Sequence, residues 1–350
     1  MSPRVGFLGT GWIGRHRMQA MLDSGAITAA AICDPSPECR DEAAKLAPDA
    51  AQVETLDAML DMGLDGVVIA TPSALHAEQA IAALEAGAAV FCQKPLGRNA
   101  AEARAVVNAA RAADRLLAVD FSYRLTEAMQ AIAALVANGE LGKVFAVDLV
   151  FHNAYGPDKD WFYDRVRSGG GCLIDLGVHL VDLALWTLGF PAVEHVAANL
   201  FGGGTPIDPA TDVEDFATAE LRTATGAVVR LSCSWRLQAG RDAIIEAQFY
   251  GTQGGAALRN VDGSFYDFVA ERYHGTATEA LSAPPDLWGG RAAVAWARRL
   301  TKDRGFDPAA DEITAVAEVI DRIYAAGESE LSISAAQPVR GGNTGIQQHA

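Results

Sequence analysis

Basic residues are scarce in this sequence of 350 residues. Lysine and arginine together number 28, against 44 aspartates and glutamates, which gives a formal net charge of −16. Proteins that bind nucleic acid rely on clustered lysine and arginine to neutralise phosphates. The deficit therefore argues against nucleic acid as a partner, although backbone amides can still bind an anion locally.

Long apolar runs and paired cysteines are missing as well. No run approaches the roughly 18 residues that a membrane-spanning helix needs, and the opening "MSPRVGFLG" has no apolar core of a signal peptide. The cysteines are odd in number and form no CxxC pair, which favours reduced thiols. We therefore expect a cytoplasmic protein that does not bind membranes. The cysteines are Cys33, Cys39, Cys92, Cys172 and Cys233.

What remains is an ordinary globular composition. Half of the residues are hydrophobic and 21% are charged, so sizeable cores can form. At roughly 150 residues per domain, the length favours two domains.

The first 120 residues alternate short apolar runs with segments of helical periodicity. Strands read as continuous apolar runs when helices cover both faces of a parallel sheet. The alternation predicts an α/β domain with a doubly wound, Rossmann-type parallel sheet. The expected strands are 4–9, 27–33, 66–71, 88–94 and 115–121, and the expected helices are 13–25, 37–47, 75–87 and 99–114.

After about residue 125, strand-like runs follow one another through short turns. This pattern predicts a C-terminal α+β domain with a large, mostly antiparallel open sheet. The predicted division is residues 1–122 for the first domain, 123–335 for the second and 336–350 for a frayed tail. The expected strands are 144–152, 193–200, 214–222, 226–236 and 243–250, and the expected helices are 127–138, 169–189 and 309–329.

The turn "GTGWIG" directly follows the first predicted strand and opens the first helix. Gly9, Gly11 and Gly14 stand in G-x-G-x-x-G spacing, which lets the backbone turn tightly and approach a pyrophosphate at the helix N-terminus. Trp12 and Ile13 lie inside the motif and are expected beside the cofactor. The competing interpretation is a glycine-rich turn that binds nothing.

Asp34 closes the second predicted strand, about 20 residues after the glycine motif. A carboxylate there can accept a hydrogen bond from a ribose 2′-hydroxyl and repels a 2′-phosphate. We therefore expect NAD, with NADP less favoured. The alternative is that Asp34 is an ordinary N-cap, and Arg40 lies too far along to argue for a 2′-phosphate.

Two further strand ends are expected at the same edge of the sheet, where open α/β sheets bind ligands. Thr71, Pro72 and His76 follow the third predicted strand, and Gln93 and Lys94 end the fourth. All five are expected to line the cofactor site. His76 is equally well explained as a surface or capping residue, and Lys94 as a side chain that reaches solvent.

The stretch "GGGCLIDLGVHLVD" places three ionisable residues in an apolar helix. Asp175, His179 and Asp182 are spaced i, i+4 and i+7, which puts them on one face, within about 60° of arc. Burying such groups is costly unless they are paired or used. From spacing alone they could form a metal site, a catalytic pair or a hydrogen-bonded packing contact.

The order of these motifs resembles one family. "VGFLGTGWIG", "ATPSALHAEQAIAALEAG", "QKPL" and "GGGCLIDLGVHLVDLALWTLG" are similar, in that order, to stretches of the glucose–fructose oxidoreductase / inositol dehydrogenase / MocA (Gfo/Idh/MocA) family of NAD(P)-dependent oxidoreductases. "FYGTQGG" is similar to the family's late strand–turn motif. The resemblance covers roughly residues 3 to 330.

The third motif departs from the family pattern, which is Glu-Lys-Pro. Gln93 keeps hydrogen-bonding capacity but lacks the negative charge. Neighbouring strand residues point to opposite faces, so residue 93 need not touch the Lys94 ammonium. The resemblance also implies a cis bond between Lys94 and Pro95.

The resemblance implies that Lys94, Asp175 and His179 are catalytic. Oxidising a secondary alcohol requires a base for the hydroxyl proton, and histidine, with an ordinary pKa near 6.5, suits that task. Asp175 would bind substrate or orient the imidazole, and Lys94 would stabilise a developing alkoxide. We predict no metal, because no other His/Cys cluster stands out; Asp182 is assigned to structural contacts.

The other residues that we expect to contact the substrate carry a weaker signal. Tyr123 and Arg124 follow the last strand of the first domain, and His152 and Tyr155 leave a strand of the second. Trp161 precedes the glycine run and could stack on a sugar or close over nicotinamide; core packing explains it equally well. Asp120 interrupts an apolar strand end without an evident reason.

The resemblance implies an NAD-dependent dehydrogenase that oxidises a secondary hydroxyl of a sugar, sugar acid or cyclitol. The alternatives are a glycoside hydrolase that retains NAD and acts by transient oxidation, and a non-catalytic NAD-binding sensor. A one-sided apolar sheet needs cover, so a homodimer or homotetramer through the second-domain sheet is expected.

Overall fold

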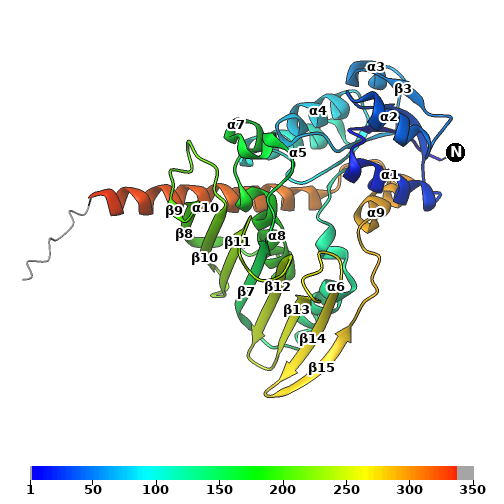
Figure 1. Ribbon diagram of the computed structural model, residues 1–350. Coiled ribbons are helices and arrows are strands. Elements are labelled where there is room, and N and C mark those ends of the chain that lie inside the picture. The colour runs from blue at the N-terminus through cyan, green and yellow to red at the C-terminus, as the bar shows by residue number, and fades with distance from the viewer. Residues whose placement is uncertain (1, 337–350) are drawn as a thin grey trace, which may run out of the picture.

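Two sheets organise the protein in the computed structural model, which describes residues 2–336 (Figure 1). Most of the expected tail, from residue 337 on, lies outside the described residues. The first sheet contains the N-terminal strands, and the second is built from residues after 143. Both predicted fold classes are confirmed.

The first sheet has six parallel strands in the order β3-β2-β1-β4-β5-β6, which is the Rossmann order. Its third strand and the short helix after it were not predicted, because each has only three to five residues. The strands are β1 Arg4–Leu8, β2 Thr28–Cys33, β3 Ala51–Val53, β4 Gly66–Ile69, β5 Ala89–Cys92 and β6 Leu117–Val119; the helices between them are α1 Trp12–Asp23, α2 Pro37–Ala44, α3 Leu56–Leu60, α4 Ser73–Glu85 and α5 Ala100–Ala113.

Helices cover both faces of this sheet, which explains why its strands are apolar throughout. Val67 and Val90 pack into the core that α4 and α5 cover, whereas Phe7 and Phe91 point to the opposite core beneath α1. Because every neighbouring pair is parallel, the carboxyl ends of the strands all lie at the same edge of the sheet.

The second sheet has nine strands in the order β15-β14-β13-β12-β7-β11-β10-β8-β9. All neighbours are antiparallel except β7 and β11. The last three strands in sequence were not predicted. The strands are β7 Val144–Asn153, β8 Val193–Gly202, β9 Thr205–Pro206, β10 Phe216–Thr223, β11 Val228–Ser234, β12 Ala243–Gly251, β13 Gly255–Asn260, β14 Phe268–His274 and β15 Ala277–Ser282.

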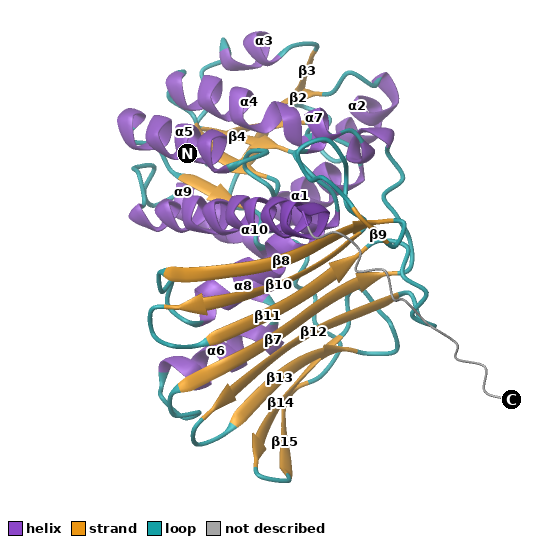
Figure 2. Cartoon of the chain, turned by 90° about the vertical axis from the view of Figure 1, so that its left-hand side faces the viewer, coloured by secondary structure: helices purple, strands orange, loops and turns teal. Residues whose placement is uncertain are grey.

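Within residues 2–336, helices cover one face of this sheet and leave the other without helices (Figure 2). The covering helices are α6 (Glu127–Ala137), α8 (Val178–Thr187) and α10 (Asp311–Ala336). Figure 2 shows the other face open toward the viewer. Strand residues accordingly alternate between buried and partly exposed, as in β12.

The helix expected over 169–189 is divided. A short helix, α7 (Arg165–Ser168), ends at the glycine run, a π-helical turn spans Leu173–Gly177, and α8 continues from there. A Cβ on Gly171 would lie 1.9 Å from the carbonyl oxygen of Glu214, so this close approach requires glycine. The wide turn carries Asp175, and such turns often occur at functional sites.

The chain does not remain in the second domain after residue 123. Helix α9 (Arg291–Leu300) returns to the first sheet, where Trp296 packs against Phe91 with ring centroids 5.9 Å apart. The predicted boundary therefore omits a C-terminal contribution to the first domain's core.

One helical stretch, Arg165–Thr187, is long and apolar enough to cross a membrane by length and composition. Inside the described molecule, 94% of that window is buried, as expected for a core helix.

Candidate active site

A cavity of about 1390 Å³ lies where the carboxyl ends of the first sheet meet the second domain. The glycine turn and the ends of β4, β5 and β6 form one side. The segments around the π-helical turn and residues 286–290 form the other. Both domains therefore contribute to one cleft.

The glycine turn fits a dinucleotide pyrophosphate. Gly11 is the N-cap of α1, no side chain caps the helix, and its first turn has no acidic residue. A Cβ on Gly11 would meet no atom within 4 Å, whereas one on Gly14 would lie 2.1 Å from the Gly9 oxygen. Gly11 thus leaves open space beside free amides, whereas Gly14 lets the helix pack closely on the preceding turn. Trp12 and Ile13 border the same open space.

Asp34 stands at the end of β2 but is tied to the loops around it. Its carboxylate accepts hydrogen bonds from the amides of Thr10, at 2.6 Å, and Ser36, at 2.9 Å. Arg40 donates to the Asp34 carbonyl oxygen at 2.5 Å, so its guanidinium lies closer to Asp34 than the sequence suggested. Asp34 is buried beside the glycine turn and is not among the residues that border the cavity.

Thr71, Pro72 and His76 border the cavity near the glycine turn. His76 forms part of its floor and is only 1% exposed. Its Nδ1 lies 2.6 Å from the carbonyl oxygen of Pro95, and its Nε2 lies 2.7 Å from the carbonyl oxygen of Thr71. The imidazole therefore braces the ends of β4 and β5 instead of projecting toward a ligand.

Lys94 and Asp175 join the two domains inside the cleft. The Lys94 ammonium donates to the Asp175 carboxylate at 2.6 Å and to its carbonyl oxygen at 2.7 Å. Trp235 donates to the other carboxylate oxygen at 3.0 Å. The Lys94–Pro95 bond is cis, as the resemblance implied. Asp175 thus orients the lysine rather than the histidine ring.

His179 lies in the same cavity with its ring against Tyr123, at a centroid distance of 4.8 Å. Burial, followed by the nearby positive charges of Lys94 and Arg17, holds the pKa of His179 well below its ordinary value. The imidazole is therefore neutral near pH 7 and can accept a proton.

Two family models match the chain in sequence order. The model of the oxidoreductase family with an NAD-binding Rossmann fold matches residues 3–121, and the GFO/IDH/MocA C-terminal domain matches residues 129–257. Together they cover more than half of the chain. The chain belongs to the Gfo/Idh/MocA family.

The curated relatives that the chain matches include dehydrogenases. D-glucoside 3-dehydrogenase of Escherichia coli (strain K12) is 34% identical over 205 residues, which is 55% of this chain and 58% of the relative. Inositol 2-dehydrogenase of Rhizobium meliloti (strain 1021) is 29% identical over 261 residues, 74% of this chain and 76% of the relative. The match therefore spans little more than half of the glucoside dehydrogenase.

Solved structures share the fold over nearly the whole chain. Levoglucosan dehydrogenase in complex with NADH and levoglucosan has a TM-score of 0.80 at 23% identity, covering 94% of this chain and 98% of that one. GenD2 from gentamicin A biosynthesis, in complex with NAD, has a TM-score of 0.78 at 25% identity, covering 94% and 95%.

Three predicted substrate residues lie away from the cavity in this family member. Arg124 pairs with Asp182 and Glu312. His152 bonds Ser234 at 2.8 Å, and its strand neighbour Phe151 is the one that faces His179. Tyr155 is exposed and bonds Asp242. These predictions are corrected, because alternation along the strand and an unforeseen ion pair direct the side chains elsewhere.

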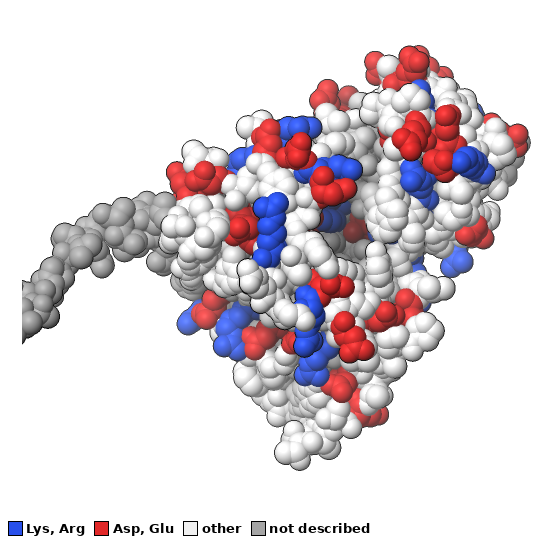
Figure 3. Space-filling model, in the orientation of Figure 1, with Lys and Arg blue, Asp and Glu red and all other residues white. Residues whose placement is uncertain are grey.

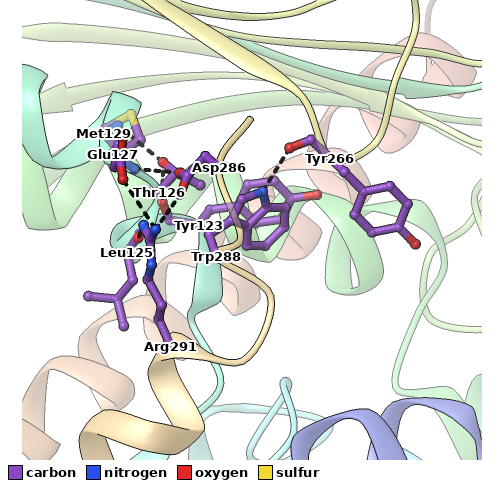
Figure 4. A network of polar contacts seen from close by, with 9 residues as sticks. All are labelled: Tyr123, Leu125, Thr126, Glu127, Met129, Tyr266, Asp286, Trp288 and Arg291. Atoms are coloured by element: carbon purple, nitrogen blue, oxygen red, sulfur yellow. Dashed lines mark hydrogen bonds and ion pairs between the residues drawn. The ribbon is translucent and has the colours of Figure 1, made fainter. Parts of the chain in front are cut away.

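Tyr123 and Trp161 do border the cavity. Trp288, which the sequence did not reveal, joins Tyr123 to form an aromatic wall, with the two ring centroids 4.9 Å apart (Figure 4). The Trp288 indole N–H donates to the backbone carbonyl oxygen of Tyr266 at 2.8 Å. Arg291 and Asp286 tie this segment to residues 125–127. Trp288 lies in a loop far along the chain from Tyr123, so no local sequence motif predicts their contact.

Charges of both signs are interspersed on the face shown in Figure 3, without a basic patch there. Within residues 2–336, no group of three or more His, Cys, Asp or Glu side chains has the geometry for a metal ion.

Proposed function

We propose that the protein is an NAD-dependent dehydrogenase of a secondary hydroxyl in a sugar, sugar acid or cyclitol. One observation carries this proposal: Lys94 from the first domain and His179 from the second border a single cavity with the glycine turn. The relatives' names, which include a glucoside and an inositol dehydrogenase, support the substrate class.

NAD, when bound, accepts the hydride that leaves the substrate carbon. His179 takes the hydroxyl proton, because its neutral, buried imidazole faces the cavity. The Lys94 ammonium stabilises the negative charge that develops on the same oxygen. Asp175 holds that ammonium in place, and Trp235 fixes the Asp175 carboxylate, so Asp175 is a positioning residue for Lys94.

The aromatic wall supports a ring-shaped polyol. Tyr123 and Trp288 present apolar ring faces beside polar groups, and sugars offer C–H faces rimmed by hydroxyls. Trp161, which stacks on Phe162 at 3.8 Å, borders the cavity from another segment. We propose that these rings position the substrate and that Gly9, Gly11, Gly14, Asp34, Thr71 and Pro72 bind or shape the site of the dinucleotide.

A panel of polyols, sugars and glycosides, each offered with NAD and with NADP, tests the function through NADH absorbance. Net NADH with at least one polyol is the expected result. Release of free sugar without net NADH would establish the glycoside hydrolase instead. Nucleotide binding with no turnover across the panel would leave a sensor.

We further propose self-association through the open face of the second sheet. That face carries Phe145, which is 49% exposed, beside the Asp148–Arg230 ion pair. Light scattering should give a dimer or tetramer, and a monomer at micromolar concentration would refute this. All five cysteines are free thiols, which fits the cytoplasmic location that we propose.

A further inference from the structure

Three polar side chains share the cavity with Lys94 and have no role in the proposed chemistry. Arg17 comes from α1, Gln93 directly follows β5, and Asp120 directly follows β6. All three border the cavity, yet they are only 6%, 9% and 1% exposed. Such burial of charge is costly unless the groups are paired or used.

One oxygen of Asp120 holds this group together. Its Oδ2 accepts from Arg17 Nε at 2.5 Å and from Gln93 Nε2 at 2.7 Å. Arg17 Nη1 lies 2.9 Å from His16 Nδ1. The three side chains are therefore fixed relative to one another and to the strand ends that carry them.

Two polar groups of the cluster take no part in these contacts. Asp120 Oδ1 is buried and accepts no hydrogen bond. Arg17 uses Nε and Nη1 in the contacts above, and its Nη2 takes part in neither of them. A buried carboxylate oxygen without a donor is unusual, so an absent hydrogen-bonding group is the natural explanation.

The position of the cluster identifies which part of a dinucleotide would reach it. In a Rossmann sheet the pyrophosphate lies at the α1 N-terminus and the adenosine lies toward the end of β2. The nicotinamide half then extends over the ends of β4, β5 and β6, where Gln93 and Asp120 stand. A nicotinamide carries a carboxamide, which offers N–H donors and one carbonyl acceptor.

We propose that Arg17 and Asp120 bind the carboxamide of the nicotinamide, with Asp120 Oδ1 accepting from its N–H and Arg17 Nη2 donating to its oxygen. Gln93 fixes the Asp120 carboxylate in this orientation. The inference rests on the proposed function only in taking NAD as the cofactor. It also explains why Gln93 can replace the glutamate of the Glu-Lys-Pro pattern: Asp120, at the end of the neighbouring strand, supplies the carboxylate instead.

The test compares two cofactors without any sugar present. NADH and its 3-acetylpyridine analogue differ only in that a methyl ketone replaces the carboxamide, so the analogue keeps the acceptor and loses the N–H donors. Calorimetric titration of the whole protein gives both Kd values. We expect the wild type to prefer NADH by about tenfold or more, as for a hydrogen bond to a charged group.

Asp120→Asn should abolish this preference. The asparagine must turn its oxygen toward Arg17 Nε and so presents an N–H to the ligand. Because Arg17 is then left without a full charge partner, a second variant, Arg17→Met with Asp120→Leu, removes both charges together, which buried pairs often tolerate. Glu318→Gln, which removes the carboxylate of an exposed ion pair with Arg104 outside the cavity, is the matched control and should retain the preference.

A sugar hydroxyl could offer the same donor to Asp120, and the experiment separates the two. If folded Asp120→Asn keeps the wild-type preference while the KM for sugar rises, the site belongs to the substrate and the proposal is overturned. Equal Kd values for the two cofactors in the wild type also overturn it. Loss of turnover on every polyol with an intact preference would instead refute only the proposed function.

Discussion

Asp175 and Asp182 lie seven residues apart on one helical segment, and each pairs with a cation from an earlier part of the chain. Asp182 receives three hydrogen bonds from Arg124, at 2.5 to 3.0 Å, and is 1% exposed. Asp175 holds the Lys94 ammonium at the cavity. The two ion pairs resemble each other in composition and differ in what else they touch.

The difference lies in how fully each cation is occupied. Arg124 also bonds Glu312 and packs against the rings of Phe121, Trp186 and Phe190, so two carboxylates and three rings hold its guanidinium. The cavity that it borders is a separate and smaller one of about 300 Å³. Lys94 ends at a cavity with room for a substrate oxygen. A buried ion pair that saturates its partners is structural, whereas one that opens on a cavity can act on a ligand.

Replacing Lys94 or His179 by alanine should have the largest effect. Each group is needed in the transition state, so kcat should fall by about 10²- to 10⁴-fold. NADH affinity should stay near wild type in both variants, as measured by titration. Thermal denaturation should show a smaller loss of stability for Lys94→Ala than for a variant that unpairs a fully buried carboxylate, because water in the cavity can solvate Asp175, whose side chain is 14% exposed. Near-normal turnover of His179→Ala would remove the catalytic assignment.

Replacing Arg124 by alanine should act on stability instead. Removing one partner of a buried pair leaves Asp182 unpaired, which costs about 3–5 kcal/mol in the free energy of unfolding. Urea denaturation measures the loss, and kcat per folded molecule should change little. A catalytic defect without destabilisation would mean that the two ion pairs have been assigned the wrong way round.

The pH dependence of oxidation tests the surroundings of His179. Because burial and nearby cations lower the pKa of His179, its neutral form persists below the ordinary value of 6.5. The acid limb of kcat/KM for oxidation should therefore lie below pH 6.5. In Lys94→Met one of those cations is gone, so NMR titration of the imidazole should show a higher pKa. An unchanged pKa would contradict the proximity of the two groups.

Asp34 gives the smallest expected effect. It hydrogen-bonds two loop amides, and Arg40 is close by, so Asp34→Ser should weaken NAD binding by about tenfold and narrow its advantage over NADP. Titration with both nucleotides measures this, and Glu318→Gln serves as the control. If the ratio of the two affinities does not move, Asp34 does not face the ribose.

The sequence predicts what local patterns encode. The glycine turn, the long strands and the residues Lys94 and His179 follow from spacing and resemblance, and they lie together in the structure. The contact between Gln93 and Asp120 depends on β5 and β6 being neighbours, so two separately noticed oddities explain each other only in the folded chain. Trp288 and Arg124 depend on partners far away in the sequence, which periodicity does not reveal.

Helix α9 has a consequence for how this protein is made. The first sheet's face that contains Phe7 and Phe91 also buries Trp296 and Leu300. During synthesis that surface stays uncovered by α9 until nearly the whole polypeptide has left the ribosome. A nascent chain stalled near residue 122 would expose this apolar surface, which favours aggregation and chaperone binding.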